Sequence, residues 1–470
     1  MSAQAKGPQA IPDSAAAIAR AVASGEISAR AVALAALERI AAHDPQIGAF
    51  TDVTAGRALA EADAVDRALA EGRRPGPLAG VPYAVKNLFD VAGLRSLAGS
   101  AINRDLPPAG ADAALVARMK AAGAVLLGGL NMGEYAYDFT GENFHYGPSR
   151  NPHDPTRMTG GSSGGSGAAV AAGFAPIALG SDTNGSIRVP AALCGVFGLK
   201  PTYGRLPRTG TFPFCDSLDH LGPLGRTAED LALCYDALQG PDAHDPACAG
   251  RPVEPALAEL AKGTGGLRVA VAGGFFRRTA QPEALAALDR VAATLGVERE
   301  IALPEVERAR ASAFLITNAE GSALHLDRLR RRAADFDPAT RDRFLAGAMI
   351  PAAWTVQAQR FRRWFHDRML ELFREVDLIL APATPCAAPA IGQTTMMLDG
   401  AEVPVRPNLG LFTQPFSFVG LPVAVVPVRG PGRLPLGVQV VAAPWREDLC
   451  LRAAAALEAA GFAAAPPAMQ

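Results

Sequence analysis

Three polar residues have the types and the setting needed to activate a nucleophile. Lys86 follows a short apolar run, VPYAV. Ser162 lies in the glycine-rich segment 159–173, TGGSSGGSGAAVAAG, and Ser186 lies in the segment 180–205, GSDTNGSIRVPAALCGVFGLKPTYGR. A lysine can serve as the base for a serine when burial and neighbouring groups lower its pKa towards neutrality. These residues therefore predict a serine nucleophile that attacks a carbonyl group.

The same glycine-rich segments are compatible with two other chemistries, and both are disfavoured. A phosphate-binding loop would present backbone N–H groups to an anion, but the lysine and Ser/Thr of the G-x-x-x-x-G-K-[ST] pattern are missing. The segment 161–165 formally matches the G-x-S-x-G nucleophile elbow. That interpretation requires a histidine base after a late strand, and the histidines, which include His220, His325 and His366, do not lie there.

From about residue 13 to 462 the chain resembles the amidase signature family. The resemblance is carried by Lys86 within VKN, by GGSSGGS and by GSDTNGSIRVPA. In the family, the first loop serine precedes the nucleophile by 24 residues, which is the separation of Ser162 and Ser186. The resemblance implies that Lys86 is the base, Ser162 the bridging serine and Ser186 the nucleophile of an amidase. It also implies a cis peptide between Gly161 and Ser162, an acyl-enzyme, and no cofactor or metal.

The turn before the nucleophile is expected to stabilise the oxyanion of the tetrahedral intermediate. Successive backbone N–H groups of Thr183, Asn184 and Gly185 can point at one position there. The commoner family pattern has two glycines before the nucleophile, and Asn184 replaces the first of them. Asparagine tolerates left-handed backbone better than most residues, so the oxyanion hole is expected to form. The amide side chain beside the reacting carbon leaves the substrate preference open.

Four neighbouring residues are expected to hold these loops in shape without taking part in the chemistry. They are Gly161, Ser163, Asp182 and Arg188. Cys194, in ALCGVFG, is expected to be a buried packing residue. Its neighbours are apolar and no base lies near it in the sequence, so it is a poor candidate for a thiol nucleophile.

Within the family, three stretches are most similar to the 1-carboxybiuret hydrolase type of amidohydrolase. They are NMGEYAYDFTGEN at 131–143, SDTNGSIRVPAALCG at 181–195, and RTGTFPF with SLDHLGP between 208 and 223. That subgroup cleaves small urea-derived amides and associates with a small helical accessory subunit. The resemblance therefore implies a small polar amide as the substrate, ammonia as a product, a role in nitrogen metabolism, and a homodimer or a heterotetramer with such a subunit.

A substrate of this type carries a carboxylate, for which a bidentate arginine is the usual partner. Arg208 and Arg406 are the candidates, and Tyr135 is a candidate for the pocket wall. Two other functions stay open. The chain could be the amidase subunit of a glutamyl-tRNA amidotransferase, or a non-catalytic family member that acts as an assembly scaffold. The intact Lys86, Ser162 and Ser186 argue against the scaffold, and a fluorophosphonate probe would distinguish it from an enzyme.

The elements that position these residues predict an α/β fold. Apolar segments separated by glycine-rich turns are typical of strands; they lie at 81–87, 124–130, 176–182, 267–273, 376–382, 421–428 and 436–442. Helical segments intervene, notably 112–122, and a helix is expected over 446–461. Alternation of this kind favours a sheet with helices on both faces, and the resemblance implies that the sheet is large and mixed. Lys86 would then lie at a carboxyl end of a strand, where α/β folds place their sites.

A single domain is expected to span residues 1–470. It would include a helical hairpin over 13–44, capped near Asp13 or Ser14 and again at Ser28, and a mainly helical segment over 304–375. Breaks are expected in that segment near Pro338 and Pro351. Stretches rich in proline and glycine at 240–265 and 382–410 are expected to be long surface loops.

Composition places this chain among ordinary globular enzymes, with 49% hydrophobic and 19% charged residues. The formal charge of −1 gives no global attraction to nucleic acid or to anionic membranes, so neither is expected as a partner. One basic cluster, Arg328 with 330–332, is expected on a solvated or partner-facing helix surface. Six scattered cysteines without a CxxC pair, and no apolar leader or membrane-length run, are typical of a soluble cytoplasmic protein.

Overall fold

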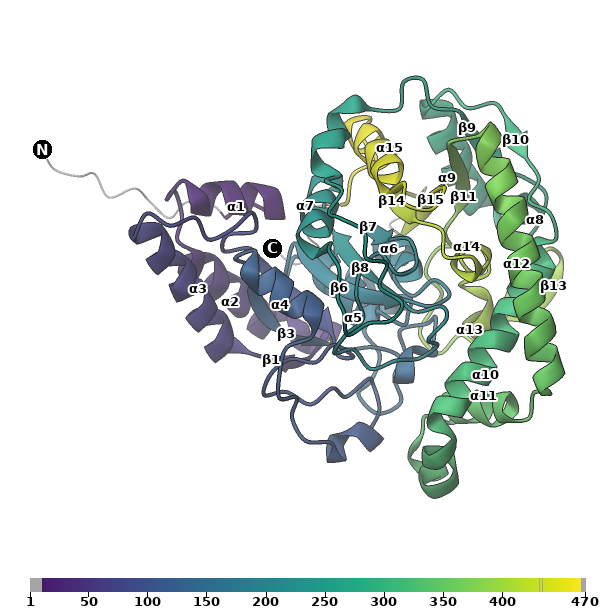
Figure 1. Cartoon of the computed structure of the whole chain (residues 1–470), viewed down its shortest axis with the longest axis horizontal. Coiled ribbons are helices and arrows are strands. Elements are labelled where there is room, and N and C mark those ends of the chain that lie inside the picture. Colours follow the sequence, from purple (N-terminus) through teal and green to yellow (C-terminus); the bar gives the residue numbers. More distant parts are fainter. Residues whose placement is uncertain (1–10, 431, 433, 466–470) are drawn as a thin grey trace, which may run out of the picture.

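The structure is a computed structural model that describes residues 11–430, 432 and 434–465 (Figure 1). The strands of its main sheet are β1 (Phe50–Val53), β2 (Pro82–Lys86), β3 (Val125–Leu130), β6 (Ile177–Asp182), β7 (Phe197–Lys200), β8 (His220–Gly225), β9 (Val269–Ala272), β10 (Glu300–Ile301), β11 (Leu378–Pro382), β14 (Val423–Arg429) and β15 (Pro435–Ala442). Within the described residues they form one eleven-stranded sheet, in the order β1-β3-β2-β6-β8-β7-β14-β15-β11-β9-β10. The sheet is mixed, because β2 runs parallel to β3 and β6 whereas β8 is antiparallel to β6.

Helices cover the sheet and extend beyond it. They are α1 (Ala15–Ala23), α2 (Ala29–Ile47), α3 (Ala55–Ala70), α4 (Ala114–Ala121), α5 (Gly164–Ala171), α6 (Arg188–Cys194), α7 (Ala228–Leu238), α8 (Phe275–Arg278), α9 (Pro282–Thr294), α10 (Val306–Arg332), α11 (Pro338–Ala348), α12 (Ala352–Glu375), α13 (Val405–Asn408), α14 (Gln414–Phe418) and α15 (Glu447–Ala459). Figure 1 shows α1–α3 at one end of the molecule and α10–α12 along the opposite side. The α/β class and the mixed sheet expected from the sequence are confirmed.

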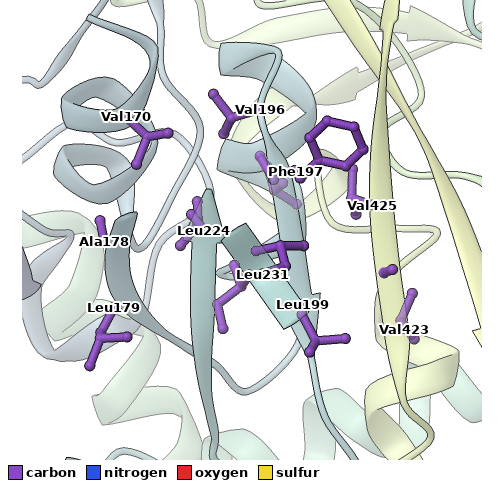
Figure 2. Packing of buried hydrophobic residues seen from close by; sticks show 14 of the residues in the cluster. Val170, Ala178, Leu179, Val196, Phe197, Leu199, Leu224, Leu231, Val423 and Val425 are labelled. Carbon is purple, nitrogen blue, oxygen red and sulfur yellow. The ribbon is translucent and has the colours of Figure 1, made fainter. Parts of the chain in front are cut away.

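The central strands are buried along their whole length, so they consist of nearly continuous apolar runs. Figure 2 shows Ala178 of β6 near Leu224 of β8 and Val170 of α5, with Leu179 farther along β6. Each of these four residues is fully buried. The register of β2 against β6 places Val85 opposite Leu179, so the carboxyl ends of the two strands meet at one edge of the sheet. That edge carries Lys86.

The sequence located most of these elements to within a few residues. All seven expected strands are present, and the two expected N-caps are Ser14 of α1 and Ser28 of α2, whose hydroxyls accept backbone N–H groups. The helical segment after residue 304 is divided where it was expected to be. Pro338 is the first residue of α11, and Pro351 precedes α12. The extension of one domain over the whole chain stays a prediction.

The prediction of a loop throughout 382–410 was wrong in part. Strands β12 (Thr395–Leu398) and β13 (Ala401–Pro404) form an antiparallel hairpin there. The two residues between them, Asp399 and Gly400, have φ values of 49° and 73°. Asp-Gly is the favoured pair for a two-residue hairpin turn, because both of its positions require positive φ. A second short hairpin joins β4 (Arg150–Asn151) to β5 (Asp154–Met158).

No helix among the described residues has both the length and the apolar character that crossing a bilayer requires.

Candidate active site

Lys86 is the last residue of β2, and its side chain is fully buried. Its Nζ donates hydrogen bonds to Ser162 Oγ at 2.7 Å and to Ser181 Oγ at 2.8 Å. Ser162 comes from the glycine-rich loop before α5, and Ser181 comes from the end of β6. The structure therefore joins Lys86 to Ser162, as the sequence predicted, and adds a second hydroxyl that the sequence did not predict.

Ser181 could have been found from the strand pairing. Because β6 runs parallel to β2 with Leu179 opposite Val85, a residue two positions after Leu179 lies at the same sheet edge as Lys86. In the sequence, GSDTNGS has the composition of one continuous loop around the nucleophile, so its first serine is not recognisable as a strand residue.

Burial lowers the pKa of Lys86 from 10.5 to about 7. Removing an ammonium group from water disfavours its charged form, whereas the carboxylates of Asp219, Asp182 and Asp138 act in the opposite direction. Near neutral pH a large fraction of Lys86 is thus an uncharged amine. Such an amine can accept a proton from a neighbouring hydroxyl.

The loop that carries Ser162 is fixed by backbone contacts. The Gly161–Ser162 peptide is cis, as the family resemblance implied. Gly161 N–H donates to the Phe139 carbonyl at 2.9 Å, and the Ser162 carbonyl accepts Gly133 N–H at 3.1 Å. A Cβ atom at Gly161 would lie 2.8 Å from Asp138 Oδ2, so a side chain at this position would collide with its neighbour. Glycine is required here by the close approach of the 138–141 turn.

Ser186 lies in the turn between β6 and α6. Its carbonyl accepts Ser163 N–H at 3.2 Å, so the turn lies against the loop of Ser162. Gly185 has a φ of 144°, and a Cβ there would lie 2.1 Å from Thr413 Oγ1. The backbone N–H groups of Asn184, Gly185 and Ser186 donate to no acceptor among the described residues.

Asp182 and Arg188 form a fully buried ion pair across this turn. Arg188 donates to both carboxylate oxygens at 2.9 Å, and Asp182 also accepts Ile187 N–H at 3.2 Å. Burial acts to raise the pKa of Asp182, but the neighbouring guanidinium outweighs it and holds that pKa well below its usual range. Arg188 further donates to the Thr413 carbonyl at 2.9 Å and to Gln439 Oε1 at 2.8 Å. The pair therefore ties both ends of the turn to the core.

A small cavity lies beside Ser186. Its wall is formed by Ala136, Tyr137, Asp138, Phe139, Thr183, Asn184, Ser186, Phe214, Phe314 and Arg343. The first four residues come from the loop after β3, and Phe314 and Arg343 come from α10 and α11. The long helical segment thus closes a cavity whose other walls come from the loops and turns that follow strands of the central sheet.

The three candidate substrate ligands lie in different places, and the cavity wall does not include them. Tyr135 is buried in an aromatic cluster, 4.0 Å from the His325 ring between centroids, and its hydroxyl donates to Asn103 at 3.1 Å. The Arg208 guanidinium pairs with Asp245 at 3.0 Å. Arg406 lies closest, because it donates to Asp138 of the wall. Both arginines are thus paired with carboxylates of their own chain.

Arg343 is a guanidinium on the cavity wall that the sequence did not predict. Its Nη1 donates to the Tyr137 carbonyl at 2.7 Å, and its Cζ lies 3.4 Å from the centroid of the Tyr137 ring. Among the described residues it has no carboxylate partner. No local sequence pattern distinguishes Arg343 from the many other arginines of 304–375. Only the packing of α11 over the cavity identifies it as a site residue.

Cys194 is fully buried in α6, and burial raises the pKa of its thiol. Its Sγ lies 3.4 Å from the Thr159 carbonyl. The expectation of a packing residue is confirmed by this burial.

Comparison with known proteins identifies the family. The sequence model described as Amidase matches residues 31–451 of the chain. The chain belongs to the amidase family. As an amidase it is a hydrolase of carbon–nitrogen bonds other than peptide bonds, and the resemblance to the amidase signature family is confirmed.

This amidase is 58% identical to AtzE, the 1-carboxybiuret hydrolase subunit of Pseudomonas sp. (strain ADP), with 94% of this chain and 97% of the relative covered. A glutamyl-tRNA(Gln) amidotransferase subunit from Roseiflexus sp. (strain RS-1) is 39% identical, with 91% of this chain and 92% of the relative covered. Among solved structures, a chain of "an unexpected vestigial protein complex" that "reveals the evolutionary origins of an s-triazine catabolic enzyme" matches with a TM-score of 0.95 and 56% identity, covering 96% of this amidase and 99% of that chain.

Proposed function

We propose that this amidase hydrolyses a small, carboxylate-bearing, urea-derived amide such as 1-carboxybiuret, through an acyl-enzyme on Ser186. The observation that carries the proposal is the 2.7 Å hydrogen bond between buried Lys86 and Ser162, whose loop contacts the turn of Ser186 through the Ser163 N–H. The similarity to a 1-carboxybiuret hydrolase subunit supports the choice of substrate.

In the proposed mechanism, Ser162 relays a proton between the nucleophile and the base. Ser186 Oγ bonds to the substrate carbonyl carbon and gives its proton to Ser162, which passes its own proton to neutral Lys86. The tetrahedral intermediate then breaks its C–N bond, and the leaving nitrogen takes a proton back through Ser162. Water repeats the sequence on the acyl-enzyme, which releases the acid and restores Ser186.

The turn before the nucleophile would stabilise the oxyanion of this intermediate. The N–H groups of Asn184, Gly185 and Ser186 are without acceptors among the described residues, and the turn borders the cavity. A donor of this kind contributes roughly 3 kcal/mol to transition-state stabilisation. We include Thr183 in the same proposed hole, because it lies in this turn next to Asp182 of the ion pair.

Arg343 would bind the substrate carboxylate. It borders the cavity and has no carboxylate partner of its own among the described residues, whereas Arg208 and Arg406 are already paired. Its face is held against the Tyr137 ring, so the guanidinium keeps free N–H groups for a bidentate contact.

Replacing the nucleophile tests the reaction. Ser186→Ala should abolish ammonia release from carboxybiuret, allophanate, biuret, malonamate, glutamine and indoleacetamide, and should abolish labelling by a fluorophosphonate probe. The wild-type chain should be labelled and should release ammonia fastest from the urea-derived amides. Turnover by Ser186→Ala near the wild-type rate would refute the mechanism. Hydrolysis of glutamine alone, and only in complex with a tRNA-binding partner, would favour an amidotransferase subunit.

Two arginine variants test the carboxylate site. Arg343→Met should raise KM for carboxylate-bearing amides about a hundredfold, as expected for loss of a charged hydrogen bond, and should change KM for biuret little. Arg208→Met is the matched control, because it removes an arginine that lies away from the cavity. Equal losses in the two variants would show that Arg343 has no special role.

Part of the helical side of the molecule would hold the accessory subunit. Large apolar residues that are more than half exposed occur near the start of α12, namely Met349 at 76%, Trp354 at 54% and Val356 at 52%. Exposed Arg360 and Arg363 lie beside them, which suits an acidic amphipathic helix. Co-purification with the co-expressed subunit should be lost in Met349→Glu/Trp354→Glu. It should persist in the control Leu34→Glu, which changes an exposed residue of α2.

A further inference from the structure

The side chain of Asn184 is a buried amide on the cavity wall with one end unoccupied. Its Nδ2 donates to Thr317 Oγ1 at 2.9 Å. Asn184 is 6% exposed and Thr317 is fully buried. Asn184 Oδ1 has no hydrogen-bond partner, and among the described residues it is the one buried, unpartnered side-chain atom that belongs to the cavity wall. Buried polar atoms are almost always paired, so this oxygen points to a missing partner.

Apart from Ser186 and the Arg343 guanidinium, which the proposed function uses, the side chains of Thr183 and Asp138 that border the cavity are already engaged. Thr183 Oγ1 donates to Asp219 at 2.6 Å. The Asp138 carboxylate accepts Gly141 N–H at 2.7 Å and binds Arg406. The Tyr137 carbonyl accepts Arg343. Asn184 Oδ1 is therefore a buried acceptor on this wall that stays unpaired within the described residues.

The acceptor is also held in place at two points. The backbone carbonyl of Asn184 accepts Thr413 Oγ1 at 2.6 Å, and its amide nitrogen is held by Thr317 of α10. Asn184 lies two residues before Ser186 in the turn that borders the cavity. If Ser186 attacks a bound carbonyl, we therefore expect the next atom on the acyl side of that carbonyl to lie near Asn184 Oδ1.

We propose that Asn184 Oδ1 is a binding subsite for an N–H group on the acyl side of the scissile carbonyl, that is, on the side opposite the leaving nitrogen. This subsite would select ureido compounds over alkyl amides. This inference rests on the proposed function, in which Ser186 attacks that carbonyl. A ureido nitrogen donates a hydrogen to the oxygen, whereas a methylene in the same place leaves the oxygen buried and unpaired. Thr317 is a positioning residue, because it holds the amide and does not itself reach the substrate. A glycine at position 184 would offer no such acceptor.

Biuret and malonamide form a suitable pair of probes. The two molecules differ only in having NH or CH₂ between their carbonyl groups, so the ratio of their kcat/KM values reports recognition of that one position. Asn184→Gly should lower the ratio of biuret to malonamide about tenfold, the factor expected for one neutral hydrogen bond. The difference in intrinsic reactivity of the two amides cancels, because the same pair is compared in both proteins.

Thr317 provides a second, independent arm. Thr317→Val should lower the same ratio by a smaller factor, and Thr317→Ser, which keeps the hydroxyl, should restore it. A merely structural role would change both kcat/KM values together and leave their ratio constant. If turnover is too slow to measure, the ratio can be obtained from competition of each amide against fluorophosphonate labelling of Ser186.

An unchanged ratio in Asn184→Gly, with Ser186 still labelled, would overturn this inference and leave the proposed function intact. A ratio that rises would overturn it as well, since it would show that Asn184 presents its nitrogen to the cavity. If Asn184→Gly fails to fold, Thr317→Val decides: a ratio equal to that of the wild type rejects the subsite. A wild-type chain that is neither labelled nor active on either amide would instead refute the proposed function.

Discussion

Two buried lysines end two strands of the same sheet, and their surroundings differ in one decisive respect. Lys86 ends β2 and Lys200 ends β7, and both side chains are fully buried. Burial lowers the pKa of each to about 7. Lys86 donates to the hydroxyls of Ser162 and Ser181, whereas Lys200 donates to the backbone carbonyls of Pro201, at 3.2 Å, and Leu421. A hydroxyl can give a proton to an amine, and a carbonyl has none to give.

The comparison separates two properties that are often treated as one. A lowered pKa supplies an uncharged amine, but only the group beside that amine decides whether a proton can reach it. At Lys86 the neighbouring hydroxyl lies in the loop next to the nucleophile. At Lys200 the same pKa accompanies a structural contact between β7 and the residues before β14. Two lysines whose pKa burial lowers to about 7 are therefore predicted to have very different effects on catalysis.

Replacing each lysine by methionine tests this difference directly. Lys86→Met should lower kcat/KM by about 10⁴-fold, because no base remains to take the proton from Ser162. Lys200→Met should change kcat/KM less than tenfold and should lower the free energy of unfolding by about 1–3 kcal/mol, since two buried carbonyls lose their donor. Steady-state kinetics and urea unfolding measure the two effects. Equal losses of activity in the two variants would show that the lowered lysine pKa matters for catalysis and that the neighbouring group, hydroxyl or carbonyl, does not.

The pH dependence of activity should report Lys86 alone. The base works as an uncharged amine, and its pKa in the folded chain is about 7. Activity should therefore be constant well above pH 7 and should fall tenfold per pH unit below it, so that about 1% remains at pH 5. Lys200→Met should keep this profile, measured as kcat/KM from pH 5 to 9. A profile without an acidic limb near pH 7, or one displaced in Lys200→Met, would contradict the assignment.

The part of the site that the sequence could predict is the part that lies in local motifs. Lys86, Ser162 and Ser186 lie in short motifs that carry the resemblance to the amidase signature family, and that resemblance predicted their roles and the large mixed sheet around them. The central strands were equally visible, since segments such as 176–182 are apolar throughout and end in turn residues. Here the local sequence and the final structure agree, because the strand pairs in register with its neighbours.

Residues that join the site through tertiary packing were not visible. Arg343 and Thr317 lie in α11 and α10, more than 100 residues after Ser186, and neither belongs to a local motif that marks it as a site residue. Their roles depend on how the helical segment packs over the sheet edge. The predicted alternatives, Arg208 and Arg406, have the right chemistry, but each is paired with an acidic residue that the sequence does not identify as its partner.

Ser181 provides the finest test, because it shares Lys86 with Ser162 but does not stand between the base and the nucleophile. Its oxygen accepts a hydrogen bond from Lys86 Nζ at 2.8 Å, and such an acceptor stabilises the ammonium form. Ser181→Ala should therefore lower the pKa of Lys86 further and move the acidic limb of the pH profile to lower pH. The plateau should fall about tenfold, since Nζ loses one of two contacts that orient it.

A matched control for this substitution is Ser166→Ala. Ser166 is also fully buried, but its hydroxyl donates to the Leu179 carbonyl at 3.1 Å and does not contact Lys86. Its removal should leave the acidic limb in place and affect stability alone. If Ser181→Ala moves the limb to higher pH or not at all, Ser181 does not tune the base. The difference between the two lysines would then rest on the bond from Lys86 to Ser162 alone.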